Sequence, residues 1–416
     1  MESKLSTRIL LLVVIALCVW SNLGIASDDV EVLQAEVTVG IDQGDFRGSD
    51  GRVLQAAVDY VGNLGGGTVR IGAGTFIMRD SLKLQDNTRV IGVPGKTILV
   101  SCDAHQSKLV STGGINERQV TVEDPSGFRI GDGVMVQDDE SMYGFYVTQA
   151  TITARLDRNT FRISRPLYHD YSPSRNGRVT SGFPVIGLWG AKNVRIEGLT
   201  IDGNSESMKY LTGCRGGGMF MFECDNVHIR NCTVRNYNGD AISFQDSTRV
   251  LIEDSICESN KGVGLHPGCG TEGATVRRTK CMKNGGDGLF LCLRVKHCVF
   301  ENNDFSDNRR HGISIGLKDS DNLFRGNVIT SNAKTGIWFR EHSAPEGAHR
   351  NVFENNRIID NGICVKIEGE HHELVFRENQ MGNTKPTTEP QSAIVSGSGA
   401  KKLTMSNNQF INVKSK

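Results

Sequence analysis

The sequence predicts an all-β chain that coils into a single stack of parallel strands, a parallel β-helix. Two observations carry this prediction: a repeat of 24 residues, and apolar/polar alternation between Asn/Gly turns. The repeat is marked by asparagines at 24-residue steps: Asn236, Asn260, Asn284, Asn308 and Asn332. At about 3.3 Å per residue, one repeat forms a coil of short strands, and stacked coils pair equivalent strands about 4.8 Å apart. We therefore expect one solenoid rather than several globular domains.

Composition and charge agree with many short strands and disfavour some partners. The 416 residues include 48 glycines and 9 prolines, and hydrophobic residues make up only 38%, which is low for a helical bundle. Basic and acidic residues number 47 each, so no net charge draws the chain to nucleic acid or to an anionic membrane. We expect a monomer with no nucleic-acid partner.

Residues 1–26 have the pattern of a secretory signal peptide. Lys4 and Arg8 precede an apolar run from 9 to 20, and small residues follow before the first acidic pair. The run is too short to cross about 30 Å of hydrocarbon. We therefore expect residues 27–416 to be secreted or periplasmic, with no membrane association after cleavage.

Several segments depart from the repeat. Residues 52–63 place apolar side chains on one helical face, Ser49 or Asp50 could cap this helix, and it is expected to cover the open end of the stack. Between about 119 and 172 the repeat is lost, and alternating runs predict a small antiparallel β insert. Shorter excursions at 204–217 and 341–350 are expected to wall a binding groove.

The repeat also predicts two stacks of identical side chains. Asparagine tolerates a left-handed backbone, and its amide can bond to the next asparagine, so the repeated asparagines should form a ladder at one corner. Cys257 and Cys281 share a repeat position and should lie one above the other. Strand neighbours lie about 4.8 Å apart, whereas the Cβ atoms of a disulfide lie about 3.8 Å apart, so we expect free thiols there.

Alternation along one repeated strand predicts which side chains face outward. The inward row is Leu265, Leu289, Ile313 and Ile337. The residues that follow them form an outward stripe: Phe220, Ser243, His266, Phe290, Ser314 and Trp338. A second outward row contains Phe222, Gln245, Cys292 and Arg340. Aromatic faces suit a pyranose ring and Arg holds a carboxylate bidentately, so we expect a sugar-binding groove; the alternative is a second small core covered by the inserts.

Two stretches resemble known proteins. GRVLQAAVDYVGNLGGGTVRIGAGTF resembles the entry motif of pectate-lyase-like right-handed β-helix proteins, and NGGDGLFLCLRVKHCVFENNDFSDNRRHGISI resembles the catalytic modules of mannuronan C5-epimerases. The resemblance implies a right-handed stack that acts on alginate-like polymers. Its catalytic motif is altered: where those modules carry Asp-Pro-His-Glu, this chain has residues 266–269, His-Pro-Gly-Cys, and Cys292 replaces a later Asp. Arg310 and His311 match their substrate-binding turn.

Chemistry on a uronate requires a cation for the carboxylate, a base for the adjacent proton and a proton donor. The catalytic candidates near the outward stripe are His266, Asp287, His311 and Arg340. The substrate-binding candidates are Asp240, Gln245, Phe290, Arg310 and Trp338.

The expected function is therefore that of a secreted carbohydrate-active protein that acts on an acidic, uronate-containing polysaccharide as a lyase or epimerase. One alternative is a glycoside hydrolase that uses Asp240 and Asp287, which two rungs place about 9–10 Å apart. Another is a non-catalytic polysaccharide-binding or surface protein. No cofactor is expected, although a calcium site is left open among turn carboxylates: Asp304, Asp307, Asp319 and Asp321.

Overall fold

The computed structural model describes residues 34–141, 146–385, 392–397 and 399–414. The chain divides into two compact units, Met1–Gln34 and Ala35–Lys416, and nearly all of the first lies outside the described residues. The predicted signal peptide lies there too. Among the described residues, no helix combines the length and the apolar character needed to cross a membrane.

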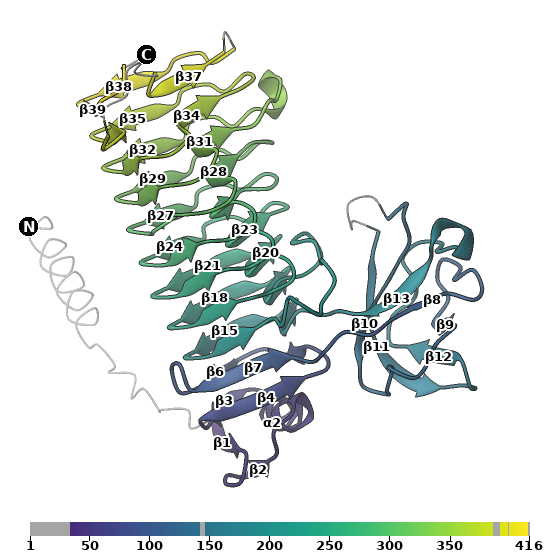
Figure 1. Ribbon diagram of the computed structural model, residues 1–416. Coiled ribbons are helices and arrows are strands. Elements are labelled where there is room, and N and C mark those ends of the chain that lie inside the picture. Colours follow the sequence, from purple (N-terminus) through teal and green to yellow (C-terminus); the bar gives the residue numbers. More distant parts are fainter. Residues whose placement is uncertain (1–33, 142–145, 386–391, 398, 415–416) are drawn as a thin grey trace, which may run out of the picture. The chain divides into compact units, whose positions relative to one another are not determined.

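Parallel strands stacked coil upon coil form the faces of the second unit (Figure 1). The longest sheet contains, in order, β2 (Phe46–Arg47), β1 (Ala35–Gly40), β3 (Gly67–Ile71), β6 (Thr88–Ile91), β15 (Lys192–Glu197), β18 (Asp225–Arg230), β21 (Thr248–Glu253), β24 (Thr275–Arg277), β27 (Val299–Glu301), β29 (Leu323–Arg325), β32 (Val352–Glu354), β35 (Val375–Arg377) and β38 (Thr404–Ser406). Another face contains β4 (Gly74–Met78), β7 (Thr97–Ser101), β16 (Thr200–Asp202), β19 (Thr233–Arg235), β22 (Ile256–Glu258) and β25 (Lys280–Met282), then β30 (Val328–Thr330), β33 (Arg357–Ile359), β36 (Gln380–Gly382) and β39 (Gln409–Ile411).

The sheet that carries the candidate residues is called the site sheet below. Its strands are, in order, β5 (Leu82–Lys83), β14 (Ile186–Trp189), β17 (Met219–Phe222), β20 (Ile242–Gln245), β23 (Leu265–Gly268), β26 (Leu289–Phe290), β28 (His311–Ile315), β31 (Thr335–Phe339), β34 (Ile363–Ile367) and β37 (Ile394–Ser396). The predicted inward row is in register from Leu265 through Leu289 and Ile313 to Ile337, and all four side chains are fully buried. The parallel β-helix prediction is confirmed.

The asparagine ladder is confirmed from Asn260 onward. The side-chain amide of each asparagine donates to Oδ1 of the next at 2.9–3.1 Å, from Asn260 through Asn284 and Asn308 to Asn332. The prediction is wrong for Asn236, which is exposed. The step at that coil is 23 residues, so the backbone N–H of Tyr237 takes the place and donates to Asn260 Oδ1 at 3.0 Å.

An α-helix, α2 (Gly51–Asn63), covers the N-terminal end of the stack, as predicted. The side chain of Asp50 accepts a hydrogen bond from the backbone N–H of Arg52 and so caps the helix. The buried face consists of Leu54, Ala57, Val58 and Val61. These residues join the main core of the β-helix, so the helix shields the first coil from edge-to-edge pairing.

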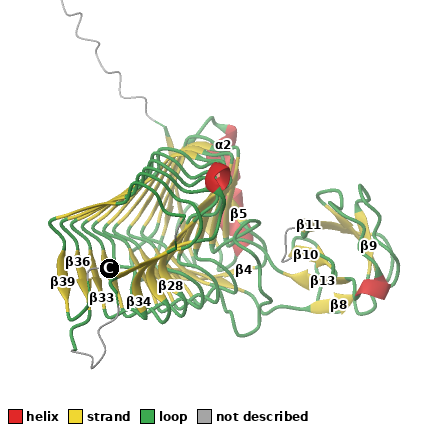
Figure 2. Cartoon of the chain, turned by 90° about the horizontal axis from the view of Figure 1, so that it is seen from above, coloured by secondary structure: helices red, strands yellow, loops and turns green. Residues whose placement is uncertain are grey.

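The antiparallel insert is confirmed, and it is larger than predicted (Figure 2). Pairing runs from Gln106 to Ser181, because the entering and leaving strands also pair with each other. Its sheet contains, in order, β8 (Gln106–Lys108), β13 (Arg178–Ser181), β10 (Gly133–Gln137), β11 (Thr148–Arg155), β12 (Thr160–Ile163) and β9 (Gln119–Thr121). Short 3-10 helices lie at Pro173–Arg175 and Ala344–Glu346. The insert buries a core of its own, which includes Phe161 and Tyr171.

Candidate functional site

The site sheet brings the sequence-predicted residues onto consecutive strands, but much of the outward stripe is buried. Exposed fractions are 0% for Ser243, 1% for Gln245, 4% for His266 and 2% for Asp240. The expectation of an open groove is therefore wrong over this part of the stripe. The alternative of a covered second core describes it better.

The cover is residues 204–217, called the covering segment below. The hydroxyl of Ser243 donates to the carbonyl oxygen of Gly213 at 2.5 Å. A Cβ atom added to Gly213 would lie 1.8 Å from Asp240 Oδ2 and 2.3 Å from His266 Nδ1. The backbone of the covering segment thus lies directly on the Asp240–His266 pair, at a distance that glycine alone permits.

Asp240 and His266 form a buried pair. Nδ1 of His266 lies 2.6 Å from Oδ2 of Asp240, while Oδ1 of the same carboxylate accepts a hydrogen bond from the backbone N–H of Val263 at 2.7 Å. Because a carboxylate only accepts, Nδ1 carries the proton and Nε2 is directed away from Asp240. Burial opposes the charged ring, yet hydrogen bonds to Asp240 and Cys292 raise the pKa of His266 to about 9.

Two cysteines complete this cluster, and sequence reasoning missed them as a group. Sγ of Cys214 lies 3.9 Å from Nε2 of His266 and 4.0 Å from Sγ of Cys292. Their contact lowers the pKa of the Cys214 thiol and raises the pKa of the Cys292 thiol. The three donor atoms lie within 4.8 Å of one another, a spacing that could hold a metal ion. No short motif such as CxxC reveals this group in the sequence, because Cys214 lies 52 residues before His266 and 78 residues before Cys292.

Two of the four turn carboxylates considered for calcium have other partners. Asp319 accepts hydrogen bonds from the backbone N–H groups of Val295 and Gly316, at 3.0 and 2.9 Å. Asp321 forms an ion pair of 2.6 Å with Arg350. These two groups therefore brace turns of the β-helix, and calcium binding stays a prediction.

Arg340 is a structural brace rather than the exposed clamp that the sequence predicts. Its side chain is 15% exposed. One guanidinium nitrogen donates to Ser314 Oγ at 2.9 Å and the other to the carbonyl oxygen of Leu291 at 2.7 Å. The group also lies 4.5 Å from the centre of the Phe290 ring. Burial lowers the pKa of Arg340, and its donors are directed into the protein.

The remaining candidates form a second cluster that is partly open to solvent. The half-buried ring of Trp338 stacks on His311 with centroids 4.4 Å apart, and its Nε1 donates to Glu368 at 2.6 Å. Asp287 accepts a hydrogen bond from the backbone N–H of His311 at 3.1 Å. The guanidinium of Arg310 lies 3.9 Å from the same carboxylate, and its side chain is half-exposed.

Burial shifts the two titratable groups of this second cluster toward their neutral forms. Desolvation and the neighbouring charge of Arg310 lower the pKa of His311 to about 4. Desolvation raises the pKa of Asp287 to about 6, against the opposing charge of Arg310. Nδ1 of His311 is buried with no hydrogen-bond partner among the described residues. The imidazole is therefore neutral at pH 7, and its unpaired Nδ1 can either accept or donate a hydrogen bond, depending on the tautomer.

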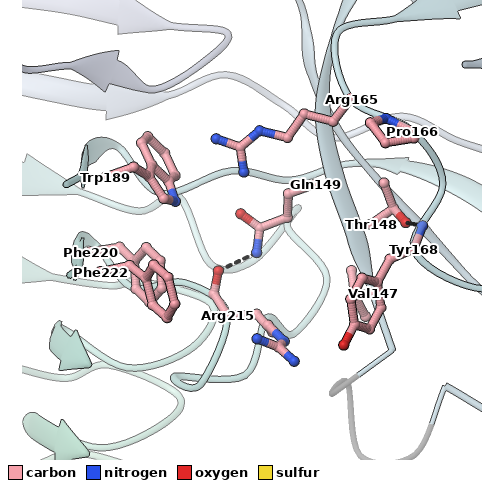
Figure 3. Close-up of a pocket in the computed structure, with 10 residues that line it drawn as sticks. All are labelled: Val147, Thr148, Gln149, Arg165, Pro166, Tyr168, Trp189, Arg215, Phe220 and Phe222. Atoms are coloured by element: carbon pink, nitrogen blue, oxygen red, sulfur yellow. Dashed lines mark hydrogen bonds between the residues drawn. The ribbon is translucent and has the colours of Figure 1, made fainter. Parts of the chain in front are cut away.

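A cavity that the sequence did not predict lies between the insert and the first coils of the site sheet (Figure 3). Its volume is about 370 Å³, within the range of small-molecule sites. The lining residues are Val147, Thr148, Gln149, Arg165, Pro166, Tyr168, Trp189, Arg215, Phe220 and Phe222. We call it the aromatic cavity. Of its residues, Phe220 belongs to the predicted stripe and Phe222 to the second outward row; the insert residues were missed because no repeat marks which of them face the β-helix.

Cations and rings alternate around the aromatic cavity. The guanidinium of Arg165 extends toward Trp189 and lies 5.0 Å from the centre of its ring (Figure 3). The guanidinium of Arg215 lies 5.6 Å from the ring centre of Tyr168, and the side-chain amide of Gln149 donates to the backbone carbonyl of Arg215. Among the described lining residues there is no carboxylate. The cavity thus combines apolar ring faces with positive charge.

Comparison with solved structures finds the same fold at low sequence identity. The A-module of mannuronan C-5 epimerase AlgE6 from Azotobacter vinelandii aligns at 14% identity and a TM-score of 0.56, over 90% of this chain and 98% of that chain. A glycoside hydrolase aligns at 10% identity and a TM-score of 0.57, over 90% of this chain and 97% of that chain. PfbA, a surface adhesin of Streptococcus pneumoniae, aligns at 15% identity and a TM-score of 0.54, over 90% of this chain and 90% of that chain.

Sequence comparison gives the family. No curated protein matches the chain. A family model described as "Right handed beta helix region" matches residues 109–280, 184–346 and 269–416, which together span more than half of the sequence. The resemblance to right-handed β-helix proteins, mannuronan C5-epimerase modules among them, is thereby confirmed for the fold. The chain belongs to the right-handed β-helix family.

Proposed function

We propose that this protein binds an acidic, uronate-containing polysaccharide in the aromatic cavity. The observation that carries the proposal is Arg165, which lies over Trp189 in an open cavity without described carboxylates. An indole face suits the apolar face of a pyranose, and a guanidinium donates two parallel hydrogen bonds to a carboxylate. Arg165 is exposed and forms no ion pair with any residue that the structure describes.

The names of the structural relatives support a polysaccharide as the partner. One is named for the epimerisation of mannuronan, another is a glycoside hydrolase and a third is a surface adhesin. Their shared fold supplies only the scaffold, so the sugar and its charge are inferred from the chemistry of the cavity. Export, as the first 26 residues predict, would place the protein where such polymers occur.

A lyase or epimerase activity is a second candidate function, favoured by the position of His311 beside half-exposed Arg310 and Asp287. Its neutral imidazole can accept the proton next to a uronate carboxylate, and half-exposed Arg310 can bind that carboxylate. The hydrolase alternative is weaker, because Asp240 already binds His266 and the backbone of Val263 under the covering segment. A glycoside hydrolase needs two carboxylates at the bond that it cleaves, and Asp240 is not free to act with Asp287.

Binding is tested by titrating alginate, pectate, a glycosaminoglycan and neutral dextran into the protein at low salt. We expect binding of the acidic polymers and not of dextran. Arg165→Ala should weaken it about 10- to 100-fold, as expected for a hydrogen bond to a charged group. Trp189→Ala should weaken it about tenfold through lost apolar contact.

The controls are matched in chemistry. Arg162→Ala removes an exposed arginine of β12 that does not line the cavity, and Tyr60→Ala removes an exposed aromatic ring of α2. Both variants should bind like the parent protein. Equal losses in Arg162→Ala and Arg165→Ala would show that the overall charge of the insert, and not the cavity, holds the polymer.

Catalysis is tested separately on any polymer that binds. A lyase creates unsaturated ends that absorb in the ultraviolet, an epimerase changes the uronate composition, and a hydrolase releases reducing ends. We expect one of the first two activities, and its loss in His311→Gln without loss of binding. Binding without any product would leave the protein a polysaccharide-binding one.

A further inference from the structure

The cluster of Cys214, His266 and Cys292 has the chemistry of a soft metal site. The cysteine sulfurs come from the covering segment and from the turn after β26, and the imidazole comes from β23. Cys214 and His266 are buried, and Cys292 is half-buried. Thiolate and imidazole are the ligands that zinc prefers, whereas calcium and magnesium take oxygen.

The distances are close to those that zinc imposes. Tetrahedral bonds of about 2.3 Å to sulfur and about 2.0 Å to nitrogen separate two sulfurs by about 3.8 Å and a sulfur from a nitrogen by about 3.5 Å. The observed separations are 4.0 Å between Sγ of Cys214 and Sγ of Cys292, and 3.9 Å between Sγ of Cys214 and Nε2 of His266. Both separations exceed the zinc values by a few tenths of an ångström, and Nε2 of His266 lies within 4.8 Å of Sγ of Cys292.

Asp240 prepares the imidazole for this role. Metal-bound histidines commonly donate their second N–H to a carboxylate, which fixes the tautomer and makes the ligand nitrogen more basic. Here Nδ1 of His266 is bonded to Oδ2 of Asp240 at 2.6 Å, and Nε2 faces the sulfur of Cys214. The backbone N–H of Val263 holds the other oxygen of that carboxylate. The orientation of His266 is thus set before any ion arrives.

The surroundings hold Cys292 and supply a further oxygen. The backbone N–H of Cys292 donates to the carbonyl oxygen of Pro267 at 3.0 Å. Beside it, a Cβ atom added to Gly268 would lie 2.8 Å from Cys292 Cβ and 2.5 Å from Gln245 Oε1. That amide oxygen is buried without a hydrogen-bond partner among the described residues. This unpaired buried acceptor belongs to β20, which pairs with the strand that carries His266, and an amide oxygen can serve as a further ligand.

We propose that Cys214, His266 and Cys292 bind one Zn²⁺ ion, which fastens the covering segment to two coils of the β-helix. The oxygen of Gln245, or a solvent molecule, is the fourth ligand. The ion would account for three features that glycan binding does not: the convergence of the donors, the Asp240–His266 bond and the unpaired oxygen of Gln245. The inference does not depend on the proposed function.

The test is a zinc titration of the full chain, stripped with a chelator and kept reduced, against a chromogenic competitor. We expect about one zinc per chain, and a thiolate-to-metal absorption band when Co²⁺ replaces Zn²⁺. Cys214→Ser and Cys292→Ser should lose the ion and the band. Cys102→Ser, which alters a half-buried thiol elsewhere, should keep both. Arg165→Ala should also keep its zinc, which separates this proposal from glycan binding.

Asp240→Asn keeps all three ligands, so it tests the zinc site even if a cysteine variant does not fold. It should weaken zinc affinity about 10- to 100-fold, as loss of an outer-shell partner does. Zinc should also raise the melting temperature of the parent protein and not that of Cys292→Ser. Three results would overturn the proposal: no zinc binding by the reduced chain, zinc retained in both cysteine variants, or a Cys214–Cys292 disulfide that persists in place of the ion.

Discussion

At the scale of single residues, burial decides what the polar side chains of the site sheet can do. Sequence alternation correctly identified the strand positions of His266 and Arg340, since period-two facing is local. It could not show that the covering segment buries His266, or that Arg340 is directed against Ser314 and Leu291, because such contacts are not periodic. It likewise did not pair His266 with Asp240, as the structure does, and the structure leaves Asp287 beside Arg310 and His311.

Arg340 gives a direct test of its structural role. Arg340→Ala would leave the carbonyl oxygen of Leu291 and the hydroxyl of Ser314 without their donor in a buried position. We expect a loss of unfolding free energy on the order of 3 kcal/mol, measured by urea denaturation. Arg325→Ala, at a 47%-exposed arginine paired with Glu301, should cost at most about 1 kcal/mol. Equal effects would mean that Arg340 does not brace the coils.

His311 should make stability depend on pH in a defined direction. Its pKa is about 4 in the folded protein and ordinarily 6.5, so the unfolded chain takes up a proton first as the pH falls. The contribution of His311 to the free energy of unfolding is present above pH 6.5 and is lost as the pH falls through 4. Arg310, Lys334, Lys366 and Glu368 face this ring and also act on it in the folded state.

The measurement compares the parent protein with His311→Gln by urea unfolding at several pH values. The stability difference between the two should shift against the parent as the pH is lowered from 6.5 to 4. Asp287 and Glu368 remain in both proteins, so their own titrations largely cancel. A difference that stays constant over this range would show that the imidazole titrates normally.

At the scale of elements, the sequence predicted what repeats and missed what does not. The fold class, the inward row, the asparagine ladder from Asn260 and the capping helix all follow from periodic patterns. A second ladder was missed because its steps alternate between 24, 29 and 23 residues. Its members are Asn303, Asn327, Asn356, Asn379 and Asn408. Insertions in the turns shift sequence spacing without changing the corner where each coil bends.

The first ladder should carry measurable stability. Asn284→Ala removes the acceptor for the backbone and side-chain amides of Asn260 and the donor to the carbonyl oxygen of Cys257. Because these groups are buried, we expect a loss of about 1–3 kcal/mol in unfolding free energy. Asn63→Ala, at an exposed position of α2, should change it by less than about 0.5 kcal/mol. An unchanged melting temperature in Asn284→Ala would show that the ladder contributes little.

The cysteine stack is a second test at this scale. Cys257 and Cys281 are aligned on neighbouring strands, as predicted, and both are buried. We expect both thiols to react when the denatured, unreduced protein is titrated with a thiol reagent. A peptide map that finds these two residues joined by a disulfide would contradict the expectation and would require a shorter approach than strand spacing allows.

At the scale of the whole second unit, the structure combines two large hydrophobic cores and a small cluster of Met135, Val147 and Leu211 that joins the insert to the covering segment. One runs through the β-helix and α2, and the other lies inside the insert. The chain leaves the β-helix at His105 and returns at Ser181, where the backbone N–H of Ser181 donates to the carbonyl oxygen of His105 at 2.8 Å. Separate cores and adjoining ends imply that the insert can be removed without opening the stack.

Deleting residues 106–180 and joining the ends through a short glycine linker tests this division. The β-helix should keep a cooperative thermal transition, with a modest loss from broken contacts such as the Arg79–Asp132 ion pair. Acidic polysaccharides should no longer bind, because Arg165 and Tyr168 are lost while Trp189 remains. Zinc should still bind, since all three ligands lie outside the deletion. If the deletion variant still bound these polysaccharides, the binding site would lie instead at the second cluster of His311 and Trp338, where the half-exposed Arg310 supplies the charge.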